Sequence, residues 1–480
     1  MMMRIHEFKD YLKKGLGRAI LLLRKEPDKT PFREAAWNHA IHDPRYDTQS
    51  NSVRGLYIQE LFDCFDDGDD LLSELLRFYS EGNVDPEDRS YHIGNLMEMK
   101  RQTEGAEAAL YAIYKKLMGD LISSKNPLTD GRGDRERDDY FYAASTLYHW
   151  NNGVLCELVR DGVTLIMKSE RYCVRDFIDF FDQEIVVAKT EEFTNILEAL
   201  KKDDPAFKEI FDSYIEESKK IQKRCASDDN TIPSPTNWRE AIDFAVQARK
   251  PRIPVKESLW RNLSNEDISE IARLAEEESD PIRRAVLIFQ IRRYGKEILE
   301  NYPRDPSPLI AELENNACAS FPFSNENLLI FELSRMVAKI RHPAVRDYAL
   351  RSLPRCLENT DSIPYSSVVE TWLTNYEPED EKALEDFVKS VNDVDVLHGI
   401  GMDLLNEEQV VSESILLYLY ENTPCSTCRH RILSTLLTRY QSSEYLPEHI
   451  SAICQEALHD CSYGTRMIAR SEAVKRKMTF

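Results

Sequence analysis

The sequence predicts an all-α protein in which helices repeat along the chain and stack into an α-α superhelix. Apolar residues recur at helical spacing, as in residues 56–65 and 71–79, whereas no convincing set of alternating strands is apparent. A short sequence motif, a turn followed by a helix, recurs several times along the chain. Only 16 of the 480 residues are glycine and 42% are hydrophobic, so the chain has few tight turns but enough apolar surface for a continuous core.

The recurring motif is a turn residue followed by an amphipathic helix, and it occurs at Asp280-Pro281, His342-Pro343 and Thr423-Pro424. Proline suits the first turn of a helix, where its missing N–H is not needed. In the C-terminal half the turns fall at Pro343, Pro378 and Pro424, with a similar turn at Asp460-Cys461. These turns are separated by roughly 35 to 46 residues, within the range of helical-repeat families. Each unit is therefore large enough for two helices and two turns.

These residues resemble the HEAT-repeat family, an armadillo-type α-solenoid. Its second helices begin at a Pro or Asp turn, with an Arg near the start and Ala and Leu on the inner face. The matching residues are Asp280, Pro281, Arg283 and Ala285; Pro343, Val345, Arg346, Ala349 and Leu350; and Pro424, Arg429 or Arg431, and Leu433. The resemblance extends over about 280–480 and more weakly over 30–120. It implies a right-handed superhelix with a concave surface for a partner.

Two polar interruptions suggest how the chain is organised. Residues 126–139 form a polar stretch without an apolar face, and residues 226–238 are rich in Ser, Pro and Asp. We expect an N-terminal helical repeat segment at 1–224, a Ser/Pro/basic hinge at 225–258 and a C-terminal HEAT-like segment at 259–480.

The N-terminal region, Ile5 to Leu23, is predicted to be one amphipathic helix that closes the end of the fold. Its apolar run is too short for a signal peptide, and no stretch of the chain approaches the length of a membrane span. We therefore expect a cytoplasmic protein without membrane contact, in which the ten scattered cysteines are reduced thiols.

Cys425-x-x-Cys428, with His430 two residues further on, is the closest approach to a metal or redox motif. A zinc site needs two further ligands, which Cys454, His459 or Cys461 could supply from the next repeat. A redox pair is expected in a strand-helix context. We favour a structural turn with packed thiols over a zinc site, and we expect no cofactor.

Arg54, Arg89, Arg283 and Arg346 each lie just inside a predicted helix, and Arg429 follows the turn at Pro424. One interpretation is a series of guanidinium groups that lines a groove for an acidic partner. The alternative, which we favour, is a set of ion pairs to Asp or Glu of the neighbouring repeat.

Three further clusters have a structural and a functional interpretation. His39 and His42 share a helix face and could bind a metal, but the pattern fits a helix ending in a polar turn. The aromatic stretch 140–150 could stack on nucleic-acid bases, although its spacing favours a helix core. Basic runs at 219–224, 249–256 and 470–477 could contact phosphate, whereas solvated charge is the simpler interpretation.

The net charge of -22 repels nucleic acid and anionic lipid at long range. Glycine-rich phosphate loops, Gly-x-Ser-x-Gly and the Rossmann fingerprint are absent from the sequence. We expect a non-catalytic scaffold or regulatory protein that binds a protein partner on a concave face. The alternatives are a nucleic-acid-binding HEAT-like solenoid and, less favoured, a metal-dependent helical enzyme.

Overall fold

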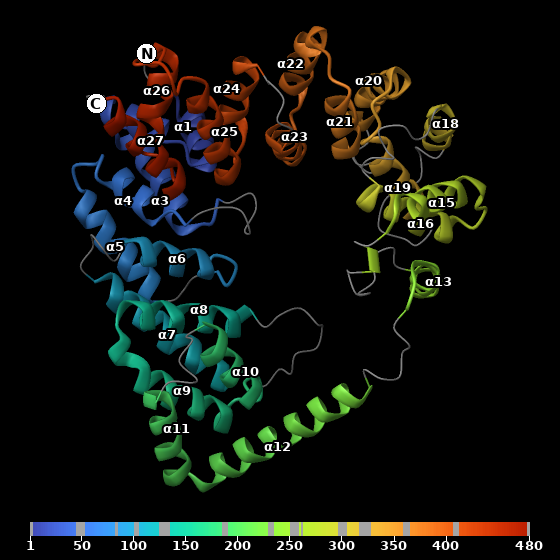
Figure 1. Ribbon diagram of the computed structural model, residues 1–480. Helices are drawn as coiled ribbons and strands as arrows, with labels where there is room; N and C mark the ends of the chain where they lie inside the picture. The colour runs from blue at the N-terminus through green and yellow to red at the C-terminus, as the bar shows by residue number, and fades with distance from the viewer. Residues whose placement is uncertain are drawn as a thin grey trace. The chain divides into compact units, whose positions relative to one another are not determined.

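The computed structural model confirms the all-α class, and its described residues contain no strand (Figure 1). The structure describes residues 3–44, 53–81, 85–99, 105–123, 135–184, 191–228, 235–249, 259–260, 263–295, 305–315, 328–358, 365–406 and 412–477. The helices divide between two compact units, of which unit 1 comprises residues 1–230 and 424–480 and unit 2 comprises residues 231–423. None of the described helices combines the length and the low polarity that a bilayer crossing requires.

The helices of unit 1 are α1 (Ile5–Lys14), α2 (Arg18–Lys25), η1 (Thr30–Phe32), α3 (Arg33–Ile41), α4 (Gly55–Phe62), α5 (Gly68–Glu81), α6 (Arg89–Met99), α7 (Ala106–Ser123), α8 (Arg135–Trp150), η2 (Asn152–Val154), α9 (Leu155–Lys168), α10 (Val174–Asp179), η3 (Phe180–Glu184), α11 (Glu191–Asp203), α12 (Pro205–Asp228), α25 (Ser426–Arg439), α26 (Glu448–Ala457) and α27 (Tyr463–Lys475).

The helices of unit 2 are α13 (Trp238–Ala248), α15 (Asn265–Glu277), α16 (Pro281–Tyr294), α18 (Ser307–Asn315), α19 (Leu328–Val337), α20 (Pro343–Glu358), α21 (Tyr365–Thr374), η4 (Pro378–Asp380), α22 (Glu381–Ser390), α23 (Val394–Asn406) and α24 (Glu413–Asn422). A core that extends from Trp238 to Tyr348 holds the first half of this unit together.

The turn prolines begin helices where the sequence predicts them. Pro281 and Pro343 are the first residues of α16 and α20, and Pro378 opens η4, which leads directly into α22. Pro424 lies two residues before α25, because Cys425 occupies the N-cap. Residues 163–167, which could pass for a strand, are part of helix α9.

Helices in unit 1 contact each other in a regular order. Helices α4, α6 and α8 form one series of contacts, and α5, α7, α9 and α11 form a second. Neighbours in sequence, such as α6 with α7 and α7 with α8, connect the two series.

The aromatic stretch of α8 belongs to the core, because Tyr140 is buried and stacks on Tyr114. This confirms the prediction of a helix core at residues 140–150.

The prediction of a single helix from Ile5 to Leu23 is wrong, because the chain forms α1 and α2 instead. Gly15 has a φ of 72° and ends α1 in the left-handed conformation, with its N–H bonded to the carbonyl of Leu12 at 3.0 Å. Glycine adopts this conformation without a steric penalty and commonly follows the end of a helix. The sequence around Gly15 therefore contains a stop signal that the apolar pattern conceals.

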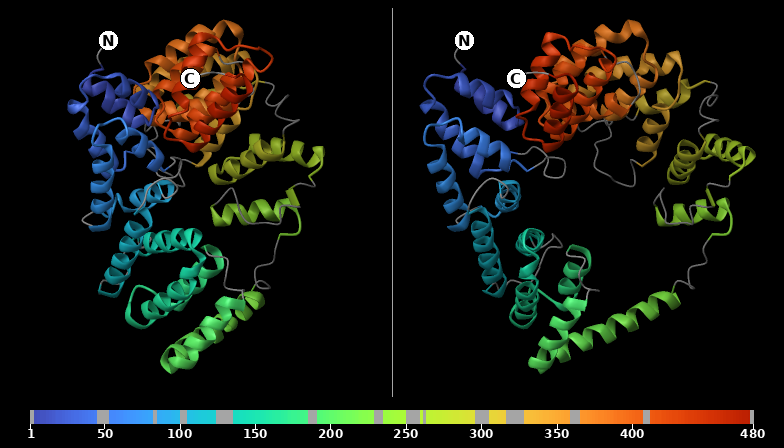
Figure 2. Two further views of the ribbon diagram at one scale, coloured as in Figure 1. Left: turned by 90° about the vertical axis from the view of Figure 1, so that its left-hand side faces the viewer. Right: turned by 60° about the vertical axis from the view of Figure 1, so that its left-hand side comes forward.

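The C-terminal helices lie beside the N-terminal ones within unit 1 (Figures 1 and 2). The N–H of Cys461 donates to the carbonyl oxygen of Gly15 at 2.9 Å, and Arg18 Nε lies 2.8 Å from Glu456 Oε2. We call this contact between residues 12–60 and 424–466 the terminal junction. The segment expected at 259–480 is therefore divided, with residues 424–480 grouped with the N-terminal helices.

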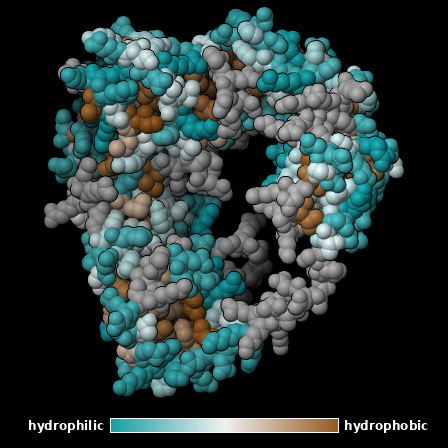
Figure 3. Space-filling view, in the orientation of Figure 1, coloured by the Kyte–Doolittle hydropathy of each residue, from teal (hydrophilic) through white to brown (hydrophobic). Residues whose placement is uncertain are grey.

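The span expected as a hinge, 225–258, contains helix as well as undescribed residues. Helix α12 continues to Asp228, and α13 occupies Trp238–Ala248. Residues 229–234 and 250–258 lie outside the described residues, as does most of the polar stretch 126–139. On the face shown in Figure 3, hydrophilic residues predominate and hydrophobic residues occur in separate patches.

We predict that Gly17→Ala destabilises the terminal junction. A Cβ at this position would lie 2.0 Å from the carbonyl oxygen of Glu456, and this backbone atom must move to accommodate it. The expected loss is about 2 to 3 kcal/mol in the free energy of unfolding, measured by urea denaturation. Gly119→Ala is the matched control, since nothing lies within 4 Å of its added Cβ and alanine favours a helix. Equal urea midpoints for the two variants would contradict this account of the junction.

Candidate functional site

The centre of the terminal junction is an ion pair between Arg429 of α25 and Asp460, the residue that opens the turn before α27. Both side chains are 0% exposed. The guanidinium binds both carboxylate oxygens, with Nε 2.9 Å from Oδ2 and Nη2 3.1 Å from Oδ1. It also donates to the carbonyl of Pro424 at 3.0 Å, while the N–H of Ser462 donates to Asp460 at 2.8 Å. Burying two charges is costly, and these additional hydrogen bonds offset the cost.

Arg54 binds the end of the N-terminal helix instead of a carboxylate. Its Nη1 donates to the carbonyl of Leu12 at 2.8 Å and its Nη2 to that of Lys13 at 3.2 Å. These carbonyls lie in the last turn of α1, where backbone acceptors are only partly satisfied and a positive charge is favoured. A Cβ on Gly15 would lie only 2.3 Å from the Cys461 sulfur, which shows how closely these two segments of unit 1 pack.

Glu60 of α4 accepts two partners from the C-terminal segment. His459 Nδ1 lies 2.7 Å from Glu60 Oε2, and Arg466 Nη1 lies 2.5 Å from Oε1. Burial opposes the charge of this carboxyl, but His459 and Arg466 together hold the pKa of Glu60 below its usual range. Arg466 also donates to the backbone carbonyl of Asp460, so it links Glu60 to the central pair.

The terminal junction is suited to stabilising the fold of unit 1 and poorly suited to nucleophilic chemistry. Burial raises the pKa of the Cys461 thiol and raises the pKa of Tyr57 well above its usual value. Tyr57 instead donates its hydroxyl to the carbonyl of Leu16 at 2.9 Å. A thiolate or phenolate nucleophile would require the opposite direction of shift.

Glu98 is an ionisable residue near the junction that sequence reasoning missed. It lies on α6, half-buried, and its Oε2 accepts the N–H of Leu56 in the first turn of α4 at 3.2 Å. Burial raises the pKa of Glu98 to about 7. No local pattern marks this residue, because its partner is 42 positions away in the sequence.

The remaining predicted arginines join one helix to another within their own unit. Arg283 Nη1 lies 2.6 Å from Asp243 of α13, and Arg346 Nε lies 3.0 Å from Asp380. Arg89 Nη1 lies 3.7 Å from Asp139, whose pKa burial raises to about 6 although Arg89 opposes this. These three arginines and Arg429 thus each form an ion pair with an acidic residue of their own unit, and Arg54 caps a helix.

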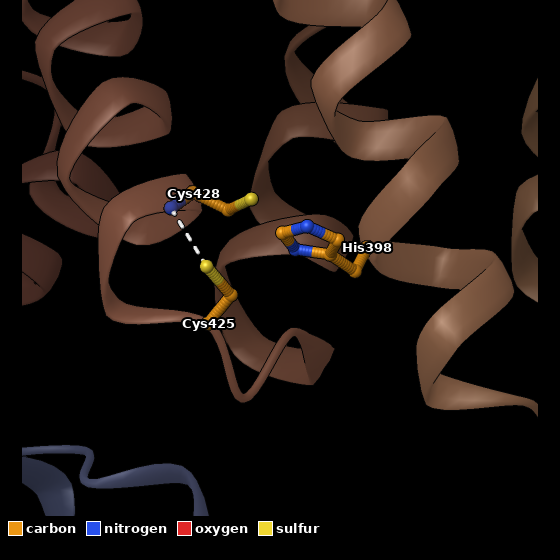
Figure 4. A group of neighbouring side chains, drawn as sticks. All are labelled: His398, Cys425 and Cys428. Carbon is orange, nitrogen blue, oxygen red and sulfur yellow. Dashed lines mark hydrogen bonds between the residues drawn. The ribbon is translucent and has the colours of Figure 1, made fainter. Parts of the chain in front are cut away.

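The candidate metal residues are only partly brought together. Cys425 is the N-cap of α25, and its sulfur accepts the N–H of Cys428 at 3.4 Å (Figure 4). The two sulfurs lie within 4.8 Å of each other, and both side chains are buried. His430 packs against Gly464, where a Cβ would lie 2.9 Å from its Nδ1. His398, also drawn in Figure 4, belongs to unit 2.

The Cys428 thiol is held in its protonated form. The hydrogen bond to Cys425 and burial both raise its pKa far above the usual value. Burial likewise raises the pKa of the Cys454 thiol to about 12. Because burial disfavours the thiolate more than the neighbouring arginines favour it, these cysteines pack as small apolar side chains.

His39 and His42 do not form a pair. Helix α3 ends at Ile41, so His42 lies beyond it, where its Nδ1 is 3.0 Å from Asp88 Oδ2. His39 is buried against the ring of Tyr57, and burial lowers its pKa well below the usual value. The end of the helix separates two residues that a longer α3 would have placed on one face.

Unit 2 has a pocket of about 400 Å³ between the turn that precedes α20 and the turn that follows α21. Asn375 ties the two turns together, since it accepts the N–H of His342 at 2.7 Å and donates to the carbonyl of Ile340 at 2.9 Å. Arg346 at the pocket wall is engaged by Asp380. Much of the polar lining therefore connects the two turns.

No family model, curated protein or solved structure matches this chain. Within the described residues the fold defines an all-helical protein, in which buried charged side chains of unit 1 join its N-terminal and C-terminal helices.

We predict that Arg429→Leu destabilises the protein by about 3 to 5 kcal/mol, because Asp460 is left buried without its counter-charge. The free energy of unfolding is measured by urea denaturation followed by circular dichroism. Arg175→Leu is the control, since its ion pair with Asp179 is exposed and removing it should change stability by less than about 1 kcal/mol. A loss below 1 kcal/mol for Arg429→Leu would refute the central role of this pair.

We predict that Glu98 makes wild-type stability decrease as the pH rises from about 4.5 to 7. Its folded pKa is raised, so the folded state retains a proton that the unfolded chain loses in this interval. The contribution to stability is complete below the unfolded pKa and is lost as the pH passes the folded pKa. Relative to Glu98→Gln, the wild type should lose on the order of 2 kcal/mol between pH 5 and pH 8. A stability difference between the wild type and Glu98→Gln that stays constant with pH would rule out a raised pKa for Glu98.

Proposed function

We propose that this chain is a non-catalytic HEAT-like helical-repeat scaffold or regulatory protein that binds a protein partner. The observation that carries the proposal is the order of helix contacts in unit 1, where α4, α6 and α8 form one series and α5, α7, α9 and α11 another. Stacked helix pairs make contacts of this nearest-neighbour kind in helical-repeat proteins. Such proteins characteristically offer extended surfaces for other macromolecules.

Ion pairs between helices of unit 2 support the same proposal. Arg283 binds Asp243 across 40 residues, Arg292 binds Glu332 across 40, and Arg346 binds Asp380 across 34. These separations correspond to one helical repeat. The arginines thus fix the spacing of consecutive units, which leaves partner recognition to other side chains.

The state of the described ionisable groups agrees with a binding role. Burial accounts for the raised pKa values of Cys454, Tyr57 and Glu98, and the hydrogen bond with Cys425 adds to burial in raising the pKa of Cys428. The free thiols of the described cysteines suit a reducing, cytoplasmic environment. The mechanism we propose is shape and charge complementarity to a partner protein.

The test is affinity purification of the tagged full chain from its native cells, with mass spectrometry, in parallel with and without nuclease. We expect a protein partner in stoichiometric amount that survives nuclease. Recovery of nucleic acid, with all protein partners lost on digestion, would replace the scaffold proposal by a nucleic-acid-binding one. Purification of the chain alone from both preparations would count against both.

A further inference from the structure

The outer face of α27 carries a continuous row of exposed side chains. Tyr463, Met467 and Val474 are 51%, 43% and 79% exposed, and the exposed Arg470 lies between Met467 and Val474. At 3.6 residues per turn these four positions fall within about 60° of each other around the helix axis. They form a single stripe about 16 Å long. We call it the α27 row.

The opposite face of α27 packs against other helices of unit 1. Thr465, Arg466 and Ala469 are buried on that side, where α27 packs against α25 and α26. Arg466 reaches Glu60 of α4. The α27 row is therefore presented on a helix that three other helices hold in place, and the residues in it are not needed for the core of unit 1.

The charge around the α27 row is positive. Arg470 and Lys477 have no ion-pair partner among the described residues. Glu472, the acidic residue of α27, is already engaged by Arg476 and Lys475. The exposed side of α27 thus presents cations in a chain whose net charge is -22.

A neighbouring loop adds a further aromatic side chain near the end of the helix. Arg476 donates to the carbonyl of Tyr440 at 2.6 Å and to that of Ser443, so it anchors this turn to α27. The same loop continues to Tyr445, which is among the most exposed aromatic residues of the described chain. Tyrosine, methionine and arginine are enriched at protein interfaces.

We propose that the α27 row is a docking site for an acidic amphipathic helix of a partner protein. The inference rests on the proposed function and gives it a location and a partner chemistry. Apolar residues of about three helical turns would cover Tyr463, Met467 and Val474, and a flanking Asp or Glu would pair with Arg470. Pairing a desolvated carboxylate with this guanidinium gives the site its specificity for acidic partners.

Charge argues against other occupants of the row. A second copy docked symmetrically through α27 would bring Arg470 and its neighbouring cations close to their own counterparts. Nucleic acid presents a continuous array of phosphates and lacks the apolar side chains that would cover Tyr463, Met467 and Val474. An acidic helix of another protein satisfies both the apolar stripe and the local positive charge.

The test uses a fluorescein-labelled peptide of about 18 residues, long enough to form a helix, with leucines on one face and glutamates elsewhere. A second peptide carries lysine in place of every glutamate. Fluorescence anisotropy with the full chain should show the acidic peptide binding about tenfold more tightly than the basic one. Arg470→Glu should reverse this preference, and Met467→Ser should weaken the binding of the acidic peptide about tenfold.

Arg175→Glu is the matched control, because it makes the same charge reversal at another exposed arginine of unit 1. Equal binding of the two peptides, or equal effects of Arg470→Glu and Arg175→Glu, would overturn the proposal. So would binding of a short DNA duplex or of vesicles containing phosphatidylglycerol that Arg470→Glu abolishes. Melting curves like that of the wild type show that each variant is folded.

Affinity purification with the same variants separates this inference from the scaffold proposal. A nuclease-resistant partner that wild type captures, and that Arg470→Glu loses while Arg175→Glu retains, supports the α27 row. A partner that all three capture equally leaves the scaffold function standing and refutes the site. If wild type captures no protein, the scaffold proposal itself fails.

Discussion

The burial of Arg429 against Asp460 is the constraint on which the rest of unit 1 depends. A guanidinium and a carboxylate without access to water are tolerable only when every polar atom finds a partner. That requirement fixes the turn at Pro424, the start of α27 and the position of Arg466, which links the pair to Glu60 of α4. The pair therefore specifies which surfaces meet, while the apolar core provides most of the favourable energy.

Two glycines allow the polar contacts to form. Gly15 ends α1 and leaves carbonyls that Arg54 binds, and Gly17 lets the backbone at Glu456 approach the start of α2. A side chain at either position would separate the N-terminal and C-terminal helices. Close backbone packing and buried charge thus act together, because the hydrogen bonds at the junction require the short distances that glycine permits.

The sequence predicted the helical class and many helix starts correctly, since these depend on neighbouring residues. Pro281 and Pro343 begin helices because proline favours the first turn wherever the helix packs. The single helix expected at Ile5–Leu23 was wrong because the apolar pattern continues across Gly15. Asp460, the partner of Arg429, lies at a turn that the sequence predicts. The contacts of Glu60 with His459 and Arg466 span about 400 residues, and no local pattern specifies them.

Unit 1 is built from two segments that lie far apart in the sequence, and this affects the order of folding during synthesis. Its two segments are separated by the 193 residues of unit 2, Thr231–Thr423. At ordinary translation rates, roughly 20 to 80 seconds pass between the emergence of Glu60 and the later emergence of its partners His459 and Arg466. During this interval the N-terminal helices have no α25–α27 to cover them. The nascent chain therefore exposes the junction surface until α25–α27 have been synthesised, and apolar surface that is transiently exposed in this way is prone to aggregation.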